Sequence, residues 1–71
     1  MTRIILCFKD GGTLGYSLVR DTEEFIKFED QDGTLLKLIK NDNKLYSYDV
    51  YNKAWKYMKN TTETLDRVEI I

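Results

Sequence analysis

The chain has 71 residues, with 11 basic and 12 acidic side chains, one cysteine, no histidine and no proline. Residues 1–71 fit one small domain, near the lower size limit for a single hydrophobic core. One cysteine excludes an internal disulfide, and the lack of histidine argues against an ordinary zinc site. The balanced charge argues against a protein that neutralises many phosphates. Because so small a core supplies only about 3–5 kcal/mol, we expect a homo-oligomer.

Short apolar stretches separated by turn clusters predict an all-β fold. The expected architecture is a small antiparallel meander of six or seven strands that closes into a barrel or sandwich. Residues 3–8 form the first predicted strand, with apolar side chains on both faces. Residues 10–12 (Asp-Gly-Gly) predict a tight hairpin before a strand at 13–20. Gly15 is interpreted as the point where this second strand lets the sheet curve.

The next predicted strand covers residues 25–29, and residues 21–24 before it resemble a helix-capping box that would give at most one helical turn. Asp32-Gly33 predicts a hairpin into a strand at 34–40. Strands at 44–50 and 54–58 follow, joined by a short turn.

The final segment, residues 61–71, is open to two interpretations. Asn60 and Glu63 are suited to capping a short helix, whereas residues 68–71 (Val-Glu-Ile-Ile) favour extended structure. We predict a strand that pairs near residues 3–8, because an uncovered apolar edge invites aggregation.

No pattern indicates an enzyme, a cofactor or a metal. Cys7 lies mid-strand among apolar residues, where a thiol is expected to be buried and inert. Residues 30–33 (Asp-Gln-Asp-Gly) lack carboxylates at the outer positions of a calcium loop. Residues 11–15 are glycine-rich but lack the lysine of a phosphate loop and lead into a strand.

Four tyrosines and the tryptophan fall within twelve residues, interleaved with lysines. Cross-strand packing explains such a cluster, because aromatic pairs stabilise sheets. Aromatic residues are also enriched at protein interfaces, and aromatics beside lysines form stacking platforms for bases. The predicted partner-binding residues are Tyr46, Tyr48, Tyr51, Trp55, Tyr57, Lys44, Lys53 and Lys56.

Residues 38–46 (Leu-Ile-Lys-Asn-Asp-Asn-Lys-Leu-Tyr) resemble the second signature of Sm-like RNA-binding proteins, in which an apolar-basic-Gly-x-Asn turn joins two strands. Lys40 matches the basic position and Asn43 the asparagine, while Asn41 replaces the glycine. The resemblance implies a ring-shaped oligomer that contacts RNA bases near Lys40 and Asn43.

We predict a non-enzymatic, small intracellular binding protein that acts on a host protein as an inhibitor or modulator. Richness in Lys, Asn, Ile and Tyr is typical of a phage or mobile-element accessory protein from an AT-rich background. The alternatives are a barrel-type or Sm-like nucleic-acid-binding protein and an oligomeric sponge for small nucleotides. The chain shows no signal peptide and no membrane span, so we expect a cytoplasmic location.

Overall fold

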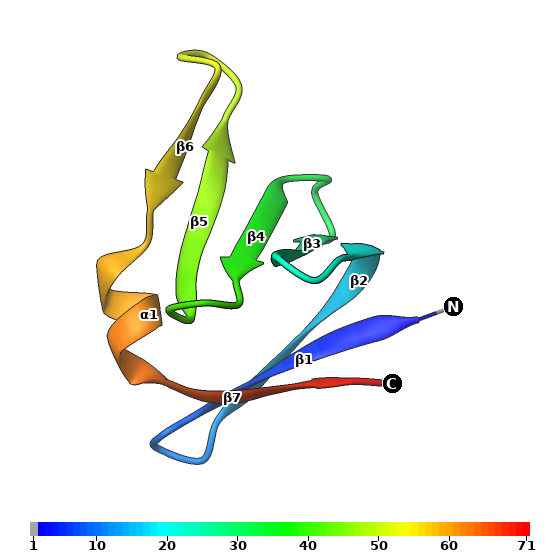
Figure 1. The fold of residues 1–71 in the computed structure, drawn as a ribbon, viewed down its shortest axis with the longest axis vertical. Helices are drawn as coiled ribbons and strands as arrows, with labels where there is room; N and C mark the ends of the chain where they lie inside the picture. The colour runs from blue at the N-terminus through cyan, green and yellow to red at the C-terminus, as the bar shows by residue number, and fades with distance from the viewer. Residues whose placement is uncertain (1) are drawn as a thin grey trace.

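A computed structural model describes residues 2–71, in which nearly all of the regular secondary structure is β-strand (Figure 1). One short helix interrupts the strands near the C-terminal end. The elements are β1 (Arg3–Phe8), β2 (Thr13–Asp21), β3 (Phe25–Glu29), β4 (Leu35–Ile39), β5 (Lys44–Asp49), β6 (Ala54–Tyr57), α1 (Lys59–Thr64) and β7 (Leu65–Ile70). Among the described residues, no helix is long and apolar enough to cross a bilayer.

The strands form one seven-stranded antiparallel sheet in the order β6-β5-β4-β3-β2-β1-β7. The predicted all-β meander is therefore confirmed, with the chain returning after β6 to place β7 beside β1. The predicted pairing of the last segment with residues 3–8 is also confirmed. In Figure 1 the β5–β6 hairpin projects from one end, and β7 lies at the opposite edge of the sheet.

The sheet does not close into a barrel, which corrects part of the predicted architecture. β6 and β7 are its two edges, and no hydrogen-bonded ladder joins them in the described chain. After β6 the chain leaves the sheet at Met58, whose backbone N–H donates to the Leu45 carbonyl at 2.9 Å. Residues 59–64 then form α1, which lies beside β5. The Thr64 carbonyl accepts a hydrogen bond from the N–H of Lys9, the residue that follows β1. The helix thus lies in the chain between β6 and β7, the two edge strands that would have to pair to close a barrel.

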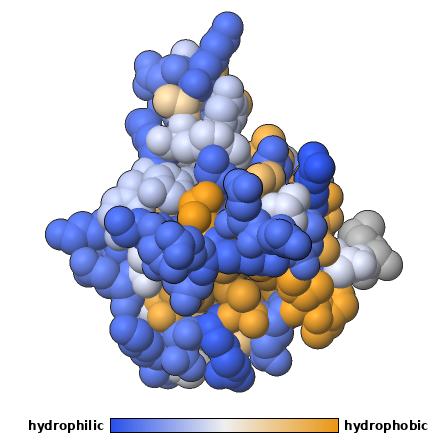
Figure 2. All heavy atoms as spheres, viewed as in Figure 1, coloured by the Kyte–Doolittle hydropathy of each residue, from blue (hydrophilic) through white to orange (hydrophobic). Residues whose placement is uncertain are grey.

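The core lies on the inner, concave face of the curved sheet. Side chains in β3 and β4 alternate between buried and half-buried positions, as expected for strands with one face in a core. Phe28 is fully buried, and the Tyr16 ring packs against the Phe28 ring with the two ring centroids 5.1 Å apart. The buried core residues are Ile4, Leu6, Ile26, Phe28, Leu36, Leu38, Leu45 and Leu65. In the view of Figure 2, hydrophobic side chains gather where β1, β2 and β7 lie, whereas the β5–β6 hairpin is mainly hydrophilic.

Turn residues explain where the strands end. Gly11 and Gly33 have φ of 92° and 82°, a backbone conformation that residues other than glycine rarely adopt. Residues 21–24 form no helical turn, because the Thr22 hydroxyl accepts the Phe25 N–H at 3.1 Å and holds a tight bend.

The register shift in β2 does not fall at Gly15, the residue predicted to let the sheet curve. The ladder between β2 and β3 shifts register between Leu18 and Arg20, whereas Gly15 pairs regularly with Ile5. A Cβ at Gly15 would lie 2.8 Å from the Arg3 guanidinium. Glycine at this position therefore makes room for the Arg3 side chain.

Candidate binding surface

The outer, convex face of the sheet carries a row of cations that runs across neighbouring strands. Lys27 of β3 and Lys37 of β4 alternate with core residues and are directly opposite each other. Arg20 is opposite Lys27 on the other side, because the register shift in β2 turns it to this face. The row continues into Tyr46 of β5 and Tyr57 of β6. One rung of the sheet therefore presents three cations followed by two phenol rings.

Four aromatic side chains form cross-strand pairs at the β5–β6 end of this face. Tyr46 is opposite Tyr57, with ring centroids 5.6 Å apart and planes inclined by 49°. Tyr48 is opposite Trp55, with centroids 5.1 Å apart and an edge-on angle of 65°. These spacings and tilts are those of favourable aromatic pairs. Packing between strands thus positions all four rings on one surface.

Lysine side chains extend over these rings. The Lys37 ammonium nitrogen lies 4.3 Å from the centroid of the Trp55 ring, and that of Lys27 lies 6.0 Å from it. At the edge of the surface, the Lys44 nitrogen lies 5.6 Å from the Tyr57 ring. Attraction to the ring faces favours these positions of the cations, most strongly for Lys37 over Trp55. We call this surface the outer-face patch, which comprises Arg20, Phe25, Lys27, Lys37, Lys44, Tyr46, Tyr48, Trp55 and Tyr57.

The cations of the outer-face patch lack acidic partners. Among residues 2–71, no ion pair joins Arg20, Lys27, Lys37 or Lys44 to a carboxylate. Like charges directly opposite each other on a sheet are destabilising. The fold therefore tolerates repulsion along this row, and the patch presents uncompensated positive charge to solvent.

Five of the eight predicted binding residues come together in the outer-face patch, and three do not. Tyr51 lies in the β5–β6 turn and is 93% exposed. Lys53 lies in the same turn with φ of 52°. Lys56 is opposite Ser47 on the other face of the sheet, with its ammonium 3.2 Å from the Asp49 carboxylate.

Sequence reasoning missed the members of the patch contributed by β2, β3 and β4. Strict alternation over residues 25–29 and 35–39 places Lys27 and Lys37 on the face away from the core. The alternating sequence pattern was sufficient to predict this placement. The placement of Arg20 depends on the register shift within β2, which no sequence pattern marks.

Asp49 stabilises the turn that joins β5 to β6 in the projecting hairpin. Its carboxylate accepts hydrogen bonds from the Asn52 side chain at 2.7 Å and from the Tyr51 and Asn52 backbone N–H groups. The bond from the Asn52 side chain is the main cause that lowers the pKa of Asp49 to about 2, and Lys56 adds to it. The carboxylate is thus committed to structure rather than to acid–base chemistry.

Two hollows on the inner side are weaker candidate sites. A groove of about 480 Å³ lies between α1 and the β1–β2 hairpin, lined by Phe8, Leu14, Tyr16, Met58, Asn60, Thr61 and Thr64. None of these residues is charged, so the groove has no side-chain cation for a nucleotide phosphate.

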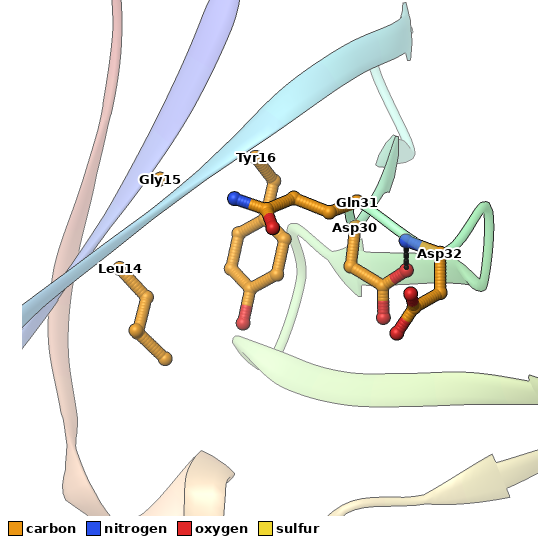
Figure 3. A pocket seen from close by; sticks show the side chains of 6 residues that line it. All are labelled: Leu14, Gly15, Tyr16, Asp30, Gln31 and Asp32. Atoms are coloured by element: carbon orange, nitrogen blue, oxygen red, sulfur yellow. Dashed lines mark hydrogen bonds between the residues drawn. The ribbon is translucent and has the colours of Figure 1, made fainter.

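The second hollow, of about 260 Å³, lies between the Tyr16 ring and the turn that follows β3 (Figure 3). In that turn the Asp30 carboxylate accepts the Asp32 N–H at 2.9 Å and the Thr34 N–H at 3.0 Å. Burial, with a smaller effect from Asp30, raises the pKa of the Tyr16 phenol. The shift only strengthens the neutral form that a phenol already has at physiological pH, and Asp30 serves the turn.

Cys7 is buried, and burial is the main cause that raises the pKa of its thiol. Its sulfur donates to the Glu69 carboxylate at 3.5 Å, which also disfavours the thiolate. Among the described residues, no group of three or more acidic, cysteine or histidine side chains is arranged to hold a metal ion.

Lys40 and Asn43, which carry the Sm-like resemblance, lie at the turn between β4 and β5. The Lys40 ammonium contacts the Asp21 carboxylate at 2.7 Å, and Asn43 adopts φ of 57°. No protein family, curated protein or solved structure matches the chain.

Proposed function

We propose that this chain is a non-enzymatic binding module that recognises an acidic surface of a partner protein through the outer-face patch. The observation that carries the proposal is the uncompensated row of Arg20, Lys27 and Lys37 beside four packed aromatic rings. Buried tyrosine and tryptophan anchors supply most of the free energy of many protein interfaces, and a complementary charge speeds association.

A protein partner fits this surface better than a single-stranded nucleic acid. Base stacking needs open ring faces, but Lys37 already lies over the face of Trp55 at 4.3 Å. The tilts of 49° and 65° also turn neighbouring rings away from a shared plane. A partner carboxylate would meet the lysines, and its apolar side chains would meet the edges of the rings.

The proposed consequence for the partner is inhibition or modulation. The proposal assigns no catalytic role to any of the described residues, so the chain would act by covering part of a partner's surface. A host factor bound by a phage or mobile-element accessory protein remains the proposed biological setting.

The test is affinity capture with the intact chain, Lys37→Glu and Trp55→Ala, followed by mass spectrometry of the retained proteins. Lys56→Glu is a matched control, because it makes the same charge change on the opposite face of the sheet, in β6. We expect the intact chain and the control to retain the same protein, and the two patch variants to lose it. Equal retention by all four would contradict the proposal.

A second arm of the experiment separates the partner classes. Each variant is titrated with single-stranded RNA and DNA at low and high salt. We expect no tight, salt-sensitive binding of either nucleic acid. Affinity that depends on Lys37 and falls steeply with salt would instead favour the nucleic-acid alternative.

A further inference from the structure

The free edge of β7 offers a backbone surface that the fold leaves unpaired. β7 hydrogen-bonds to β1 on one side, and no described strand pairs with its other side. Arg3 and Ile71 exchange two backbone hydrogen bonds, of 2.8 and 2.9 Å, so the Ile71 groups face β1. Backbone groups alternate in direction along a strand. Those of Val68 and Ile70 therefore point away from β1, toward the open edge.

This edge has few of the features that usually protect an edge strand from pairing. It runs for six residues and contains no proline and no lysine. Ile70 at its end and Ile71 just beyond it are 41% and 70% exposed. Natural proteins usually blunt such edges with charged side chains, lysine above all, or with proline, bulges or a covering element. The charged residues of β7 are Asp66, Arg67 and Glu69, which carry both signs. The bulge against β1 lies at the start of β7, near Phe8, and leaves the remaining residues regular.

The charges on β7 match a second copy of the same strand. Arg67 and Glu69 flank Val68 and share the outer face, where they contact each other at 3.6 Å. When two β7 strands pair antiparallel about Val68, each Arg67 is opposite Glu69 of the second copy. A pairing centred on Arg67 or on Glu69 instead sets two identical charges against each other, which is destabilising. Only the register about Val68 combines matched charges with outward-pointing backbone groups.

From these features we infer that a second copy of this chain pairs antiparallel with β7 about Val68, joining two seven-stranded sheets into one. Val68 of each copy then exchanges both backbone hydrogen bonds with its equivalent. The dimer leaves the outer-face patch free on both copies, because the patch lies on β2 to β6 and the contact on β7. The inference is independent of the proposed function and would survive its failure.

The experiment measures mass in solution for the intact chain and for charge variants. The intact chain is expected at twice the 8.4 kDa monomer mass. Arg67→Glu and Glu69→Arg are each expected to be monomers, because each places like charges across both copies. Mixing the two variants restores opposite charges at both positions, so the mixture is expected to form a heterodimer. Lys9→Glu, a charge reversal on an exposed turn residue, should leave the dimer intact.

The mixing step separates loss of dimerisation from loss of folding, since an unfolded variant would not recover on mixing. Circular dichroism of each variant is the control that measures whether it keeps its β-structure. A monomeric intact chain at the highest soluble concentration would overturn the inference. Dimers that persist in both single variants, or a mixture of folded variants that stays monomeric, would also overturn it.

Discussion

Replacing Lys27 by glutamate is expected to stabilise the fold, although it alters the centre of the outer-face patch. Lys27 lies between Arg20 and Lys37, directly opposite each of them. A carboxylate at this position changes two repulsive cross-strand pairs into two attractive ones. The change requires no repacking of the core, because Lys27 points to the outer face and is half-buried.

The size of the gain follows from the number of pairs and contacts affected. Each opposite-charge cross-strand pair contributes about 0.2–1 kcal/mol. Against this, the variant loses the contacts of the Lys27 ammonium with the Phe25 and Trp55 rings, at 5.7 and 6.0 Å. These distances are near the limit of about 6 Å for a cation–π interaction, so the loss is small. We expect a net gain of about 0.5–1 kcal/mol, or about 2–8 °C in Tm for a domain of this size.

Urea unfolding followed by Trp55 fluorescence measures this gain. Lys27→Gln is the matched control, because it removes the repulsion without adding attraction and should fall between the two charged forms. The gain should shrink in about 1 M salt, where screening acts within about 3 Å. Loss of stability in Lys27→Glu, or a gain that salt leaves unchanged, would refute the account of the cation row.

Three further predictions concern the scaffold. Phe28→Ala removes a fully buried ring and is expected to lower the free energy of unfolding by about 3–5 kcal/mol. That loss is enough to unfold much of the protein, and circular dichroism measures the unfolded fraction. Thr62→Val removes the hydroxyl that accepts the Leu45 N–H at 3.0 Å and should cost about 1–3 kcal/mol in urea unfolding, whereas Thr62→Ser should cost less. The folded-state pKa of Asp49 is lowered from 3.8 to about 2, so its contribution is present above about pH 4 and lost as pH falls toward 2. The stability difference between the intact chain and Asp49→Asn should shrink over that range in acid unfolding.

Local signals in the sequence were enough to predict most of the sheet. Asp32-Gly33 predicts a hairpin because glycine adopts φ of 82° there, and alternation on either side then assigns faces to β3 and β4. Closure was not predictable in this way. It depends on whether residues 59–64 continue as a strand or leave the sheet, and their own propensities are mixed. The contact of Thr62 with the Leu45 backbone, which ties the helix to β5, joins residues far apart in sequence.

The candidate surface was predictable only where its residues are neighbours in the sequence. The pairing of Tyr46 with Tyr57 and of Tyr48 with Trp55 follows from a single hairpin. Lys56 does not share that surface, because its position in the strand alternates with those of the rings. The cation row depends on three strands and a register shift at Leu18, so local patterns could not assemble it.

The central claim is that the outer-face patch binds the partner, and calorimetric titration of the captured protein tests it most directly. The intact chain, Lys37→Glu and Lys56→Glu are compared under one set of conditions. Loss of an interface hot spot costs about 2 kcal/mol or more, so we expect Lys37→Glu to weaken Kd by about 30-fold. Lys56→Glu should change Kd by less than about twofold, since exposed charges away from an interface contribute little. Equal affinities for all three chains, or a loss confined to Lys56→Glu, would contradict the account.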